Sequence, residues 1–128
     1  MKPKTKNWLK IAKYDLRVAK VSLDNHLYLQ VFESCHCSLE KIIKGIIYEN
    51  KERQPPKIHD LLKLISLAMI KQVNDDIKIT LDKLNDIYFM ARYPDNFEEV
   101  EAYLSKEKAS DIHKKTERIF KWLEKKLK

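Results

Sequence analysis

Glycine is almost absent from this chain. Its 128 residues include one glycine and four prolines, and 35% of the residues are charged. A glycine-rich loop that wraps a phosphate needs a backbone that approaches the ligand closely, so such a loop is excluded. Short strands joined by tight hairpins also need turn residues that are scarce here, whereas the abundant Lys, Glu, Leu and Ile favour helices. The composition therefore predicts an all-α protein.

Arginine is also scarce. The chain has 26 basic and 19 acidic residues and a net charge of +7, but only Arg17, Arg53, Arg92 and Arg118 are arginines. Lysines spread over helical faces mostly keep a protein soluble, whereas the guanidinium group binds phosphates and carboxylates through paired hydrogen bonds. The charge is compatible with RNA binding but does not indicate it. Each arginine is a candidate for a specific contact.

Long apolar runs, a secretion signal and a metal motif are missing. The N-terminus, MKPKTKNWLK, lacks the apolar core of a signal peptide. We therefore expect a cytoplasmic protein without a membrane partner. The only cysteines, Cys35 and Cys37, have a spacing that does not suit a structural disulfide. On a helix they point about 200° apart, so we predict two buried thiols, no metal site and no cofactor.

Apolar side chains recur at helical spacing along most of the chain. The helices expected from this spacing cover residues 5–24, 27–50, 59–70, 75–91 and the stretch from Ser105 onward. Two prolines end the polar connection before the third helix, and the acidic stretch after Pro94 is expected to be irregular to about Leu104. Gly45 would let another helix approach closely. The prediction is one domain, residues 1–128, folded as an up-and-down bundle of four main helices and one short helix.

The segment ARYPD, residues 91–95, presents an arginine and a tyrosine where a helix stops. Pro94 prevents the helix from continuing, and an arginine suits the negative end of a helix dipole. A helix end thus explains Arg92 and Pro94 but not Tyr93 or Asp95. Because the proline fixes the direction of the chain, we expect Arg92 and Tyr93 to be held rigidly.

Other charged residues border apolar stripes. His59 begins a helix, where its ring faces a cleft or where His59 and Asp60 form an ordinary helix cap. Glu40, Lys41 and Lys44, in LEKIIKG, form either an exposed charged edge or a pair of cations beside a ligand groove. Both interpretations stay open for both groups.

Four blocks follow one another along the chain: WLKIAKYDLRVAK, FESCHCSLEKIIKGII, IHDLLKL and ARYPD, before a long amphipathic helix. Together they resemble the HEPN domain family over nearly the whole chain. The resemblance implies a helical bundle that commonly forms a homodimer whose helices line a cleft. It also implies a partner, because many members form a complex or a toxin–antitoxin pair with a minimal nucleotidyltransferase. Other members are metal-independent ribonucleases in which four to six residues separate an Arg from a His.

That ribonuclease signature is missing after Arg92. The resemblance places the signature's arginine near Arg92, but residues 97–99, where its histidine is expected, are Phe-Glu-Glu. Arg53 and His59 have the spacing by count; His59 would then be the general base and Arg53 would stabilise the phosphorane charge. Because two prolines lie between them, we interpret the match as a chance one. We predict no catalytic residue and keep a ribonuclease toxin as an alternative.

The preferred interpretation is a non-catalytic HEPN protein that binds a nucleotide, a minimal nucleotidyltransferase partner, or both. Arg92 would contact a phosphate or a partner carboxylate, and Tyr93 would stack on a base or a partner side chain. Asp95 would orient Arg92 or accept a hydrogen bond from a sugar hydroxyl. Lys41 and His59 are further candidates for the binding site.

A purely structural role is the third interpretation. Asp15 lies on an apolar stripe and needs a partner, so Arg92 is tied between helices to a carboxylate such as Asp15 or Glu40 in this alternative. The chain would then be a helical interaction module.

Overall fold

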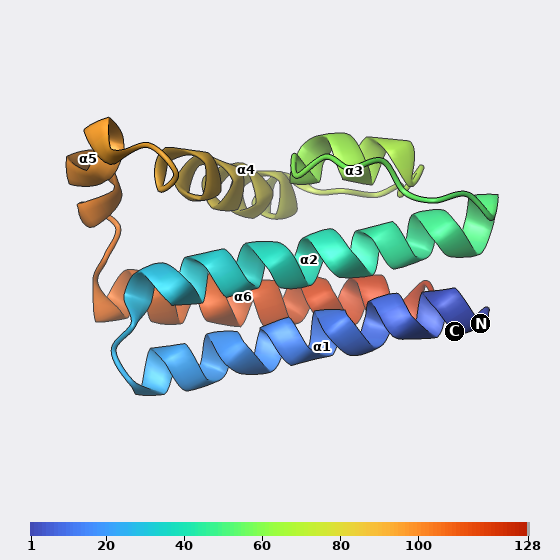
Figure 1. Ribbon diagram of the computed structural model, residues 1–128, viewed down its shortest axis with the longest axis horizontal. Helices are drawn as coiled ribbons and strands as arrows, with labels where there is room; N and C mark the ends of the chain where they lie inside the picture. The colour runs from blue at the N-terminus through green and yellow to red at the C-terminus, as the bar shows by residue number, and fades with distance from the viewer. Residues whose placement is uncertain (128) are drawn as a thin grey trace.

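The structure, a computed structural model, describes residues 1–127 and contains helices but no strand in that range (Figure 1). The helices are α1 (Pro3–Asp24), α2 (Tyr28–Lys51), α3 (Leu61–Leu67), α4 (Asp75–Met90), the 3₁₀ helix η1 (Pro94–Asn96), α5 (Phe97–Glu101) and α6 (Lys106–Lys125). The predicted all-α class is confirmed, with four long helices. None of the helices in this range combines the length and the apolar character that a membrane span requires.

Helix α2 is the centre of the bundle. It contacts α1 and α6 on one side and α3 and α4 on the other, and both chain ends lie at the same end of the molecule (Figure 1). Phe32, Leu39 and Ile43 of α2 are fully buried in the core. A helix that packs against several neighbours needs apolar residues around most of its circumference, as α2 has.

Gly45 brings α1 against α2 as the sequence predicts. A Cβ atom added at Gly45 would lie 3.1 Å from the Cβ of Trp8 on α1, which is tighter than ordinary contact. Because glycine has no side chain at this point, the two helices approach each other closely along their length.

Side-chain caps fix where three helices begin. Asp60 precedes α3 and accepts hydrogen bonds from the backbone N–H groups of Leu62 and Lys63. Asn74 caps α4, and Ser105 caps α6 by accepting from the N–H of Lys108. Each cap satisfies a donor that the helix itself leaves unpaired. The predicted capping roles of Asp60 and Ser105 are confirmed.

The prediction that the stretch up to about Leu104 is irregular was wrong for residues 94–101. This segment forms η1 and α5, and Val100 of α5 is fully buried. Glu98 and Glu99 lie in the first turn of α5, where carboxylates favour the positive end of a helix. The acidic residues therefore support a short helix that the burial of Val100 holds in place.

Candidate functional site

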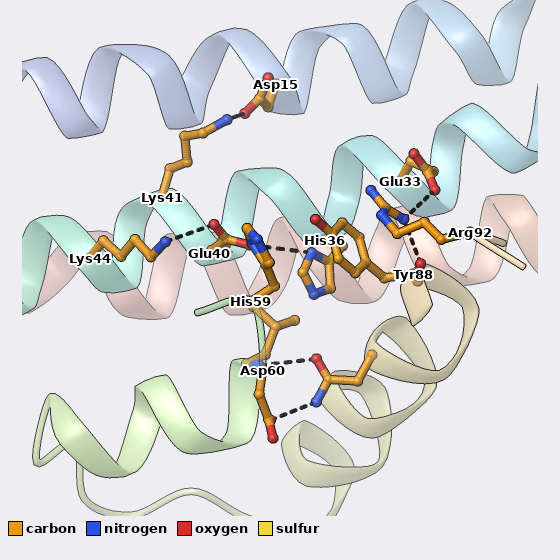
Figure 2. A network of polar contacts seen from close by, with 12 residues as sticks. Asp15, Glu33, His36, Glu40, Lys41, Lys44, His59, Asp60, Tyr88 and Arg92 are labelled. Carbon is orange, nitrogen blue, oxygen red and sulfur yellow. Dashed lines mark hydrogen bonds and ion pairs between the residues drawn. The ribbon is translucent and has the colours of Figure 1, made fainter. Parts of the chain in front are cut away.

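The ring of Tyr88, on α4, is the centre of a stack of side chains (Figure 2). The guanidinium carbon of Arg92 lies 3.3 Å from the centre of the Tyr88 ring. The ring of His36 stacks on Tyr88 at 3.9 Å between ring centres with 14° between the planes, and the His59 ring lies at 5.4 Å with a tilt of 41°. A cation over an aromatic face is attracted by the ring quadrupole. Tyr88 thus joins residues from α2, α4 and the segment before α3.

Arg92 is anchored along one edge and open along the other. Its Nη1 donates to Glu33 Oε1 on α2 at 3.0 Å and to the backbone carbonyl of Tyr88. Its Nε and Nη2 donate no hydrogen bond within residues 1–127, and 42% of the side chain is exposed. Helix α4 ends at Met90 and η1 begins at Pro94, so Arg92 is held in the short turn between them. Three N–H donors of this anchored guanidinium therefore have no partner within residues 1–127.

A groove of about 780 Å³ opens beside Arg92. Its lining comprises His26, Leu27, Tyr28, Leu29, Gln30, Glu33, Ala91, Arg92, Phe97 and Leu104. Leu27 and Phe97 are exposed to solvent at 58% and 47%, so this groove places two large exposed apolar side chains along one lining. The groove is therefore mostly apolar, and its one Arg–Glu pair supplies the charge at its edge.

Glu40 lies two turns along α2 from Glu33, in a very different environment. Its side chain is 8% exposed, and its Oε2 accepts from Lys44 Nζ at 2.9 Å while its Oε1 lies 3.0 Å from Nδ1 of His59. The same Oε1 is 3.8 Å from Nδ1 of His36. A buried carboxylate is tolerated because two groups compensate its charge. Figure 2 shows these residues converging on Glu40.

His36 is buried as a neutral imidazole. Its side chain is fully buried, and neither ring nitrogen makes a hydrogen bond within residues 1–127. Burial disfavours the charged form and lowers the pKa of His36 to about 4, although the charge of Glu40 works in the opposite direction. His36 therefore serves as a flat support for Tyr88 at neutral pH.

Asp60 and Asn85 position His59. Asp60 Oδ1 accepts from Asn85 Nδ2 at 2.9 Å, and Asn85 Oδ1 accepts from the N–H of Leu61 at 3.0 Å. This reciprocal pair joins the start of α3 to the middle of α4. His59 precedes Asp60, so the pair places its half-exposed ring next to Glu40 and Tyr88 (Figure 2).

Lys41 belongs to a separate contact between α1 and α2. Its ammonium donates to Asp15 Oδ2 at 2.6 Å, and both side chains are partly buried. Burial works to lower the pKa of Lys41, but the hydrogen bond and charge of Asp15 outweigh it and the pKa is raised. Asp15 has the partner that its place on an apolar stripe required. One of the two open interpretations, that Lys41 and Lys44 are a pair of cations beside a ligand groove, finds no support, because each is paired with a carboxylate and neither lines the groove beside Arg92.

The predicted site residues are only partly brought together. Tyr93 and Asp95 follow Arg92 at the surface, and both are exposed. Within residues 1–127, the carboxylate bonded to Arg92 is that of Glu33, whereas the sequence suggested Asp95 or, in the structural alternative, Asp15 or Glu40. Arg53 is exposed and makes no ion pair or hydrogen bond in that range, so the Arg53–His59 pair has no structural support.

Three residues of the site were missed by sequence reasoning: Glu33, His36 and Tyr88. Glu33, His36 and Glu40 recur at helical spacing, which places them on one face of α2. Tyr88 and Arg92 are four residues apart, which is the spacing that lets a cation just beyond a helix end reach a ring in its last turn. These two spacings are the features of the sequence from which the three residues could have been predicted.

The cysteines and acidic residues offer no metal centre in the described part of the chain. Both cysteines are free, and burial raises the pKa of Cys35 to about 12, so its thiol stays protonated. No group of three or more His, Cys, Asp or Glu side chains comes together there in a way that suits a metal ion. The chemistry of the candidate site is therefore argued from the charged and aromatic side chains around Tyr88.

Comparison with known proteins identifies the family but no individual relative. Neither a curated protein nor a solved structure matches the chain significantly. Residues 5–126 match the HEPN domain, which leaves only a few residues at each end outside the match. This helical chain therefore belongs to the HEPN domain family.

Proposed function

We propose that this chain is a non-catalytic HEPN protein that binds a partner protein in the groove beside Arg92. The observation that carries the proposal is the guanidinium of Arg92, which lines the groove, is anchored to Glu33 and Tyr88 through Nη1, and has three N–H donors without a partner within residues 1–127. A pre-oriented arginine binds a carboxylate through two parallel hydrogen bonds with little loss of side-chain entropy.

The charge of the groove favours a protein over a nucleotide. Glu33 neutralises much of the charge of Arg92, whereas a nucleoside triphosphate carries several negative charges that need several donors. The exposed Leu27 and Phe97 instead suit a segment with apolar side chains. Protein interfaces combine such apolar centres with arginine and aromatic residues. A partner segment with apolar side chains and one carboxylate therefore fits best.

Tyr93 extends this surface. It adjoins Arg92 in the chain and is 63% exposed, and exposed tyrosines contribute strongly to interfaces because one end is apolar and the other polar. Asp95 is exposed and lies in η1, directly after that turn. In this proposal Tyr93 packs on the partner, and Asp95 is a peripheral polar contact.

The family suggests which partner to test. A minimal nucleotidyltransferase is the partner that the resemblance implies, and a homodimer and a toxin–antitoxin relationship stay predictions beside it. Glu33, Arg92 and Tyr93 would form the contact with the nucleotidyltransferase. The nucleotide itself would then be bound by the partner rather than by this chain.

Calorimetry with a minimal nucleotidyltransferase encoded in the same genome tests the proposal. We expect a complex that Arg92→Ala weakens at least about tenfold, because a charge-assisted contact contributes roughly 1.5–3 kcal/mol. Arg118→Ala removes an arginine from α6, outside the groove, and should leave the affinity unchanged. Equal binding by the Arg92→Ala variant would contradict the proposal. A titration with ATP should show no binding; ATP binding that Arg92→Ala abolishes would favour the nucleotide instead.

RNA cleavage is the second candidate, and one contact favours it. His59 is half exposed and hydrogen-bonded to the buried carboxylate of Glu40, an arrangement that orients a general base, and His59 and Arg92 contact the same Tyr88 ring. Metal-free cleavage of single-stranded RNA should disappear in His59→Ala if this candidate holds. Equal activity of the variant and the unmodified chain would remove it.

A further inference from the structure

A second cavity lies between the start of α4 and the later half of α6. Its volume is about 420 Å³, within the range of roughly 300–1,000 Å³ that is typical of small-molecule sites. Its lining consists of Gln72, Asn74, Asp76, Ile77, Thr80, Lys115, Arg118, Ile119 and Trp122. None of these residues lines the groove beside Arg92. The cavity is therefore a separate place on the molecule.

Two opposite charges on this cavity are free to bind a ligand. Asp76 and Arg118 both line it and are exposed, yet within residues 1–127 neither charged group makes an ion pair or a hydrogen bond. In particular, they are not paired with each other. The third charged residue, Lys115, differs because its Nζ is 2.9 Å from Asp111 Oδ2. One carboxylate and one guanidinium thus flank an empty space without neutralising each other.

The rest of the lining combines three polar residues, Gln72, Asn74 and Thr80, with three apolar ones, Ile77, Ile119 and Trp122. Ile119 is 5% exposed, and Ile77 and Trp122 are half-buried against the core. The Nζ of Lys126 lies 4.4 Å from the centre of the Trp122 ring, which holds the indole in place. An aliphatic group of a ligand would lose contact with water against these three side chains.

We propose that this cavity binds a small zwitterion with an apolar side chain, of the class of the branched aliphatic α-amino acids. The ligand carboxylate is bound by Arg118, its ammonium by Asp76, and its side chain packs on Ile77, Ile119 and Trp122. A guanidinium matches a carboxylate in geometry, and a carboxylate accepts hydrogen bonds from an ammonium. A ligand with one charge would leave either Asp76 or Arg118 without a partner. The inference is independent of the function proposed for the Arg92 groove.

The fluorescence of Trp122 provides the test, with L-leucine as the probe because leucine does not fluoresce. In a Trp8→Phe background Trp122 is the only tryptophan, and leucine should change its emission in a saturable way. The analogues 4-methylpentanoate, which lacks the amine, and 3-methylbutylamine, which lacks the carboxylate, should each bind at least about tenfold more weakly. Equal binding of either analogue would overturn the proposal.

Substitutions in the cavity complete the test. Arg118→Gln and Asp76→Asn should each weaken leucine binding at least about tenfold. Asp75→Asn is a matched control, because Asp75 shares the first turn of α4 but does not line the cavity, and Lys114→Gln is the control on α6. Undiminished binding by the two cavity variants would overturn the proposal.

A second measurement guards against a disturbed fold. Trp8 packs on Gly45, so its substitution could perturb the contact between α1 and α2. The leucine titration is therefore repeated by calorimetry on the unmodified chain. Saturable heat that Arg118→Gln and Asp76→Asn remove supports the site, whereas no binding up to about 10 mM leucine, a free energy weaker than about −2.7 kcal/mol, overturns it.

Discussion

Glu33 and Glu40 lie on the same face of α2, yet their ion pairs have different surroundings. Glu33 pairs with a half-exposed Arg92, whereas Glu40 is almost completely buried between Lys44 and His59. The first pair borders an open groove and leaves N–H donors unpaired. Both carboxylate oxygens of Glu40 are engaged: one accepts from Lys44 within α2, and the other contacts His59, which joins α2 to the segment before α3.

Burial decides what each pair can do. An exposed pair contributes little to stability, since water screens it, and its groups stay available to a ligand. A buried pair has already lost its water, so removing one member leaves the other charge uncompensated. We therefore assign the Glu40 pair, in the middle of α2, to stability and the Glu33–Arg92 pair, near the start of α2, to binding. The predictions below test that assignment.

The largest effect is expected at Glu40. Glu40→Ala leaves the buried Lys44 without its carboxylate and should lower the free energy of unfolding by about 3–5 kcal/mol. Glu33→Ala is the matched control on the same helix and should cost no more than about 1 kcal/mol. Urea denaturation measures both values. Similar losses of stability in the two variants would show that burial does not distinguish the Glu40 pair from the Glu33 pair.

The next effect is a loss of stability in mild acid that depends on His36. The pKa of His36 is lowered from 6.5 to about 4 in the folded chain, so below pH 6.5 the unfolded state binds a proton that the folded state excludes. Stability should fall between pH 6.5 and 4, by roughly 2–3 kcal/mol at pH 4.5.

His36→Phe separates this effect from the titration of carboxylates. Phenylalanine keeps a flat ring against Tyr88 but has no proton to bind. The stability of the variant should therefore depend less on pH between 6.5 and 4.5 than that of the unmodified chain. Denaturation curves at the two pH values provide the comparison. Parallel losses in the two proteins would mean that His36 is not the group responsible.

A loss of stability between those of Glu40→Ala and Arg92→Ala is expected at Asp60. Asp60→Ala removes the cap of α3 and the acceptor of the Asn85 amide, and should cost about 1–2 kcal/mol. Asp75→Ala removes a carboxylate that makes no such bonds within residues 1–127, and should cost about 0.5 kcal/mol or less. Thermal unfolding measures both. A neutral result for Asp60→Ala would mean that the Asp60–Asn85 pair does not hold His59 in place.

The smallest effect on stability is expected at Arg92. Its contact with Tyr88 and its exposed pair with Glu33 are each worth about 0.2–1 kcal/mol, so Arg92→Ala should cost about 1 kcal/mol. The unfolding midpoint in urea measures this value. A loss near that of Glu40→Ala would make Arg92 a structural residue, as in the third interpretation of the sequence.

The fold could be predicted from the sequence because its signals are local. Helical spacing of apolar residues predicted the long helices. The residue types at Ser105 and Asp60 indicated helix caps, and Gly45 indicated the close approach of α1. Pro94 correctly placed Arg92 just beyond a helix end. Helix α5 was missed because its stability depends on the burial of Val100, a tertiary contact that five acidic and apolar residues do not reveal.

The site was less predictable because its contacts are between distant segments. Arg92 and Glu33 are 59 residues apart in the chain, and their pairing depends on how α4 packs along α2. Glu40 and Lys44 have the composition of an exposed charged edge, which was one of the two interpretations left open, but both side chains are buried and His59 lies against Glu40. Charge patterns indicate which residues are polar, whereas burial depends on the whole fold.

Two values measured on Arg92→Ala test most directly the claim that Arg92 binds a partner: its affinity for the proposed minimal nucleotidyltransferase partner and its unfolding free energy. We predict that affinity falls at least about tenfold while stability falls by about 1 kcal/mol. An unchanged affinity with a loss of about 3 kcal/mol or more in stability would contradict the account, because Arg92 would then hold the bundle together instead of binding a partner.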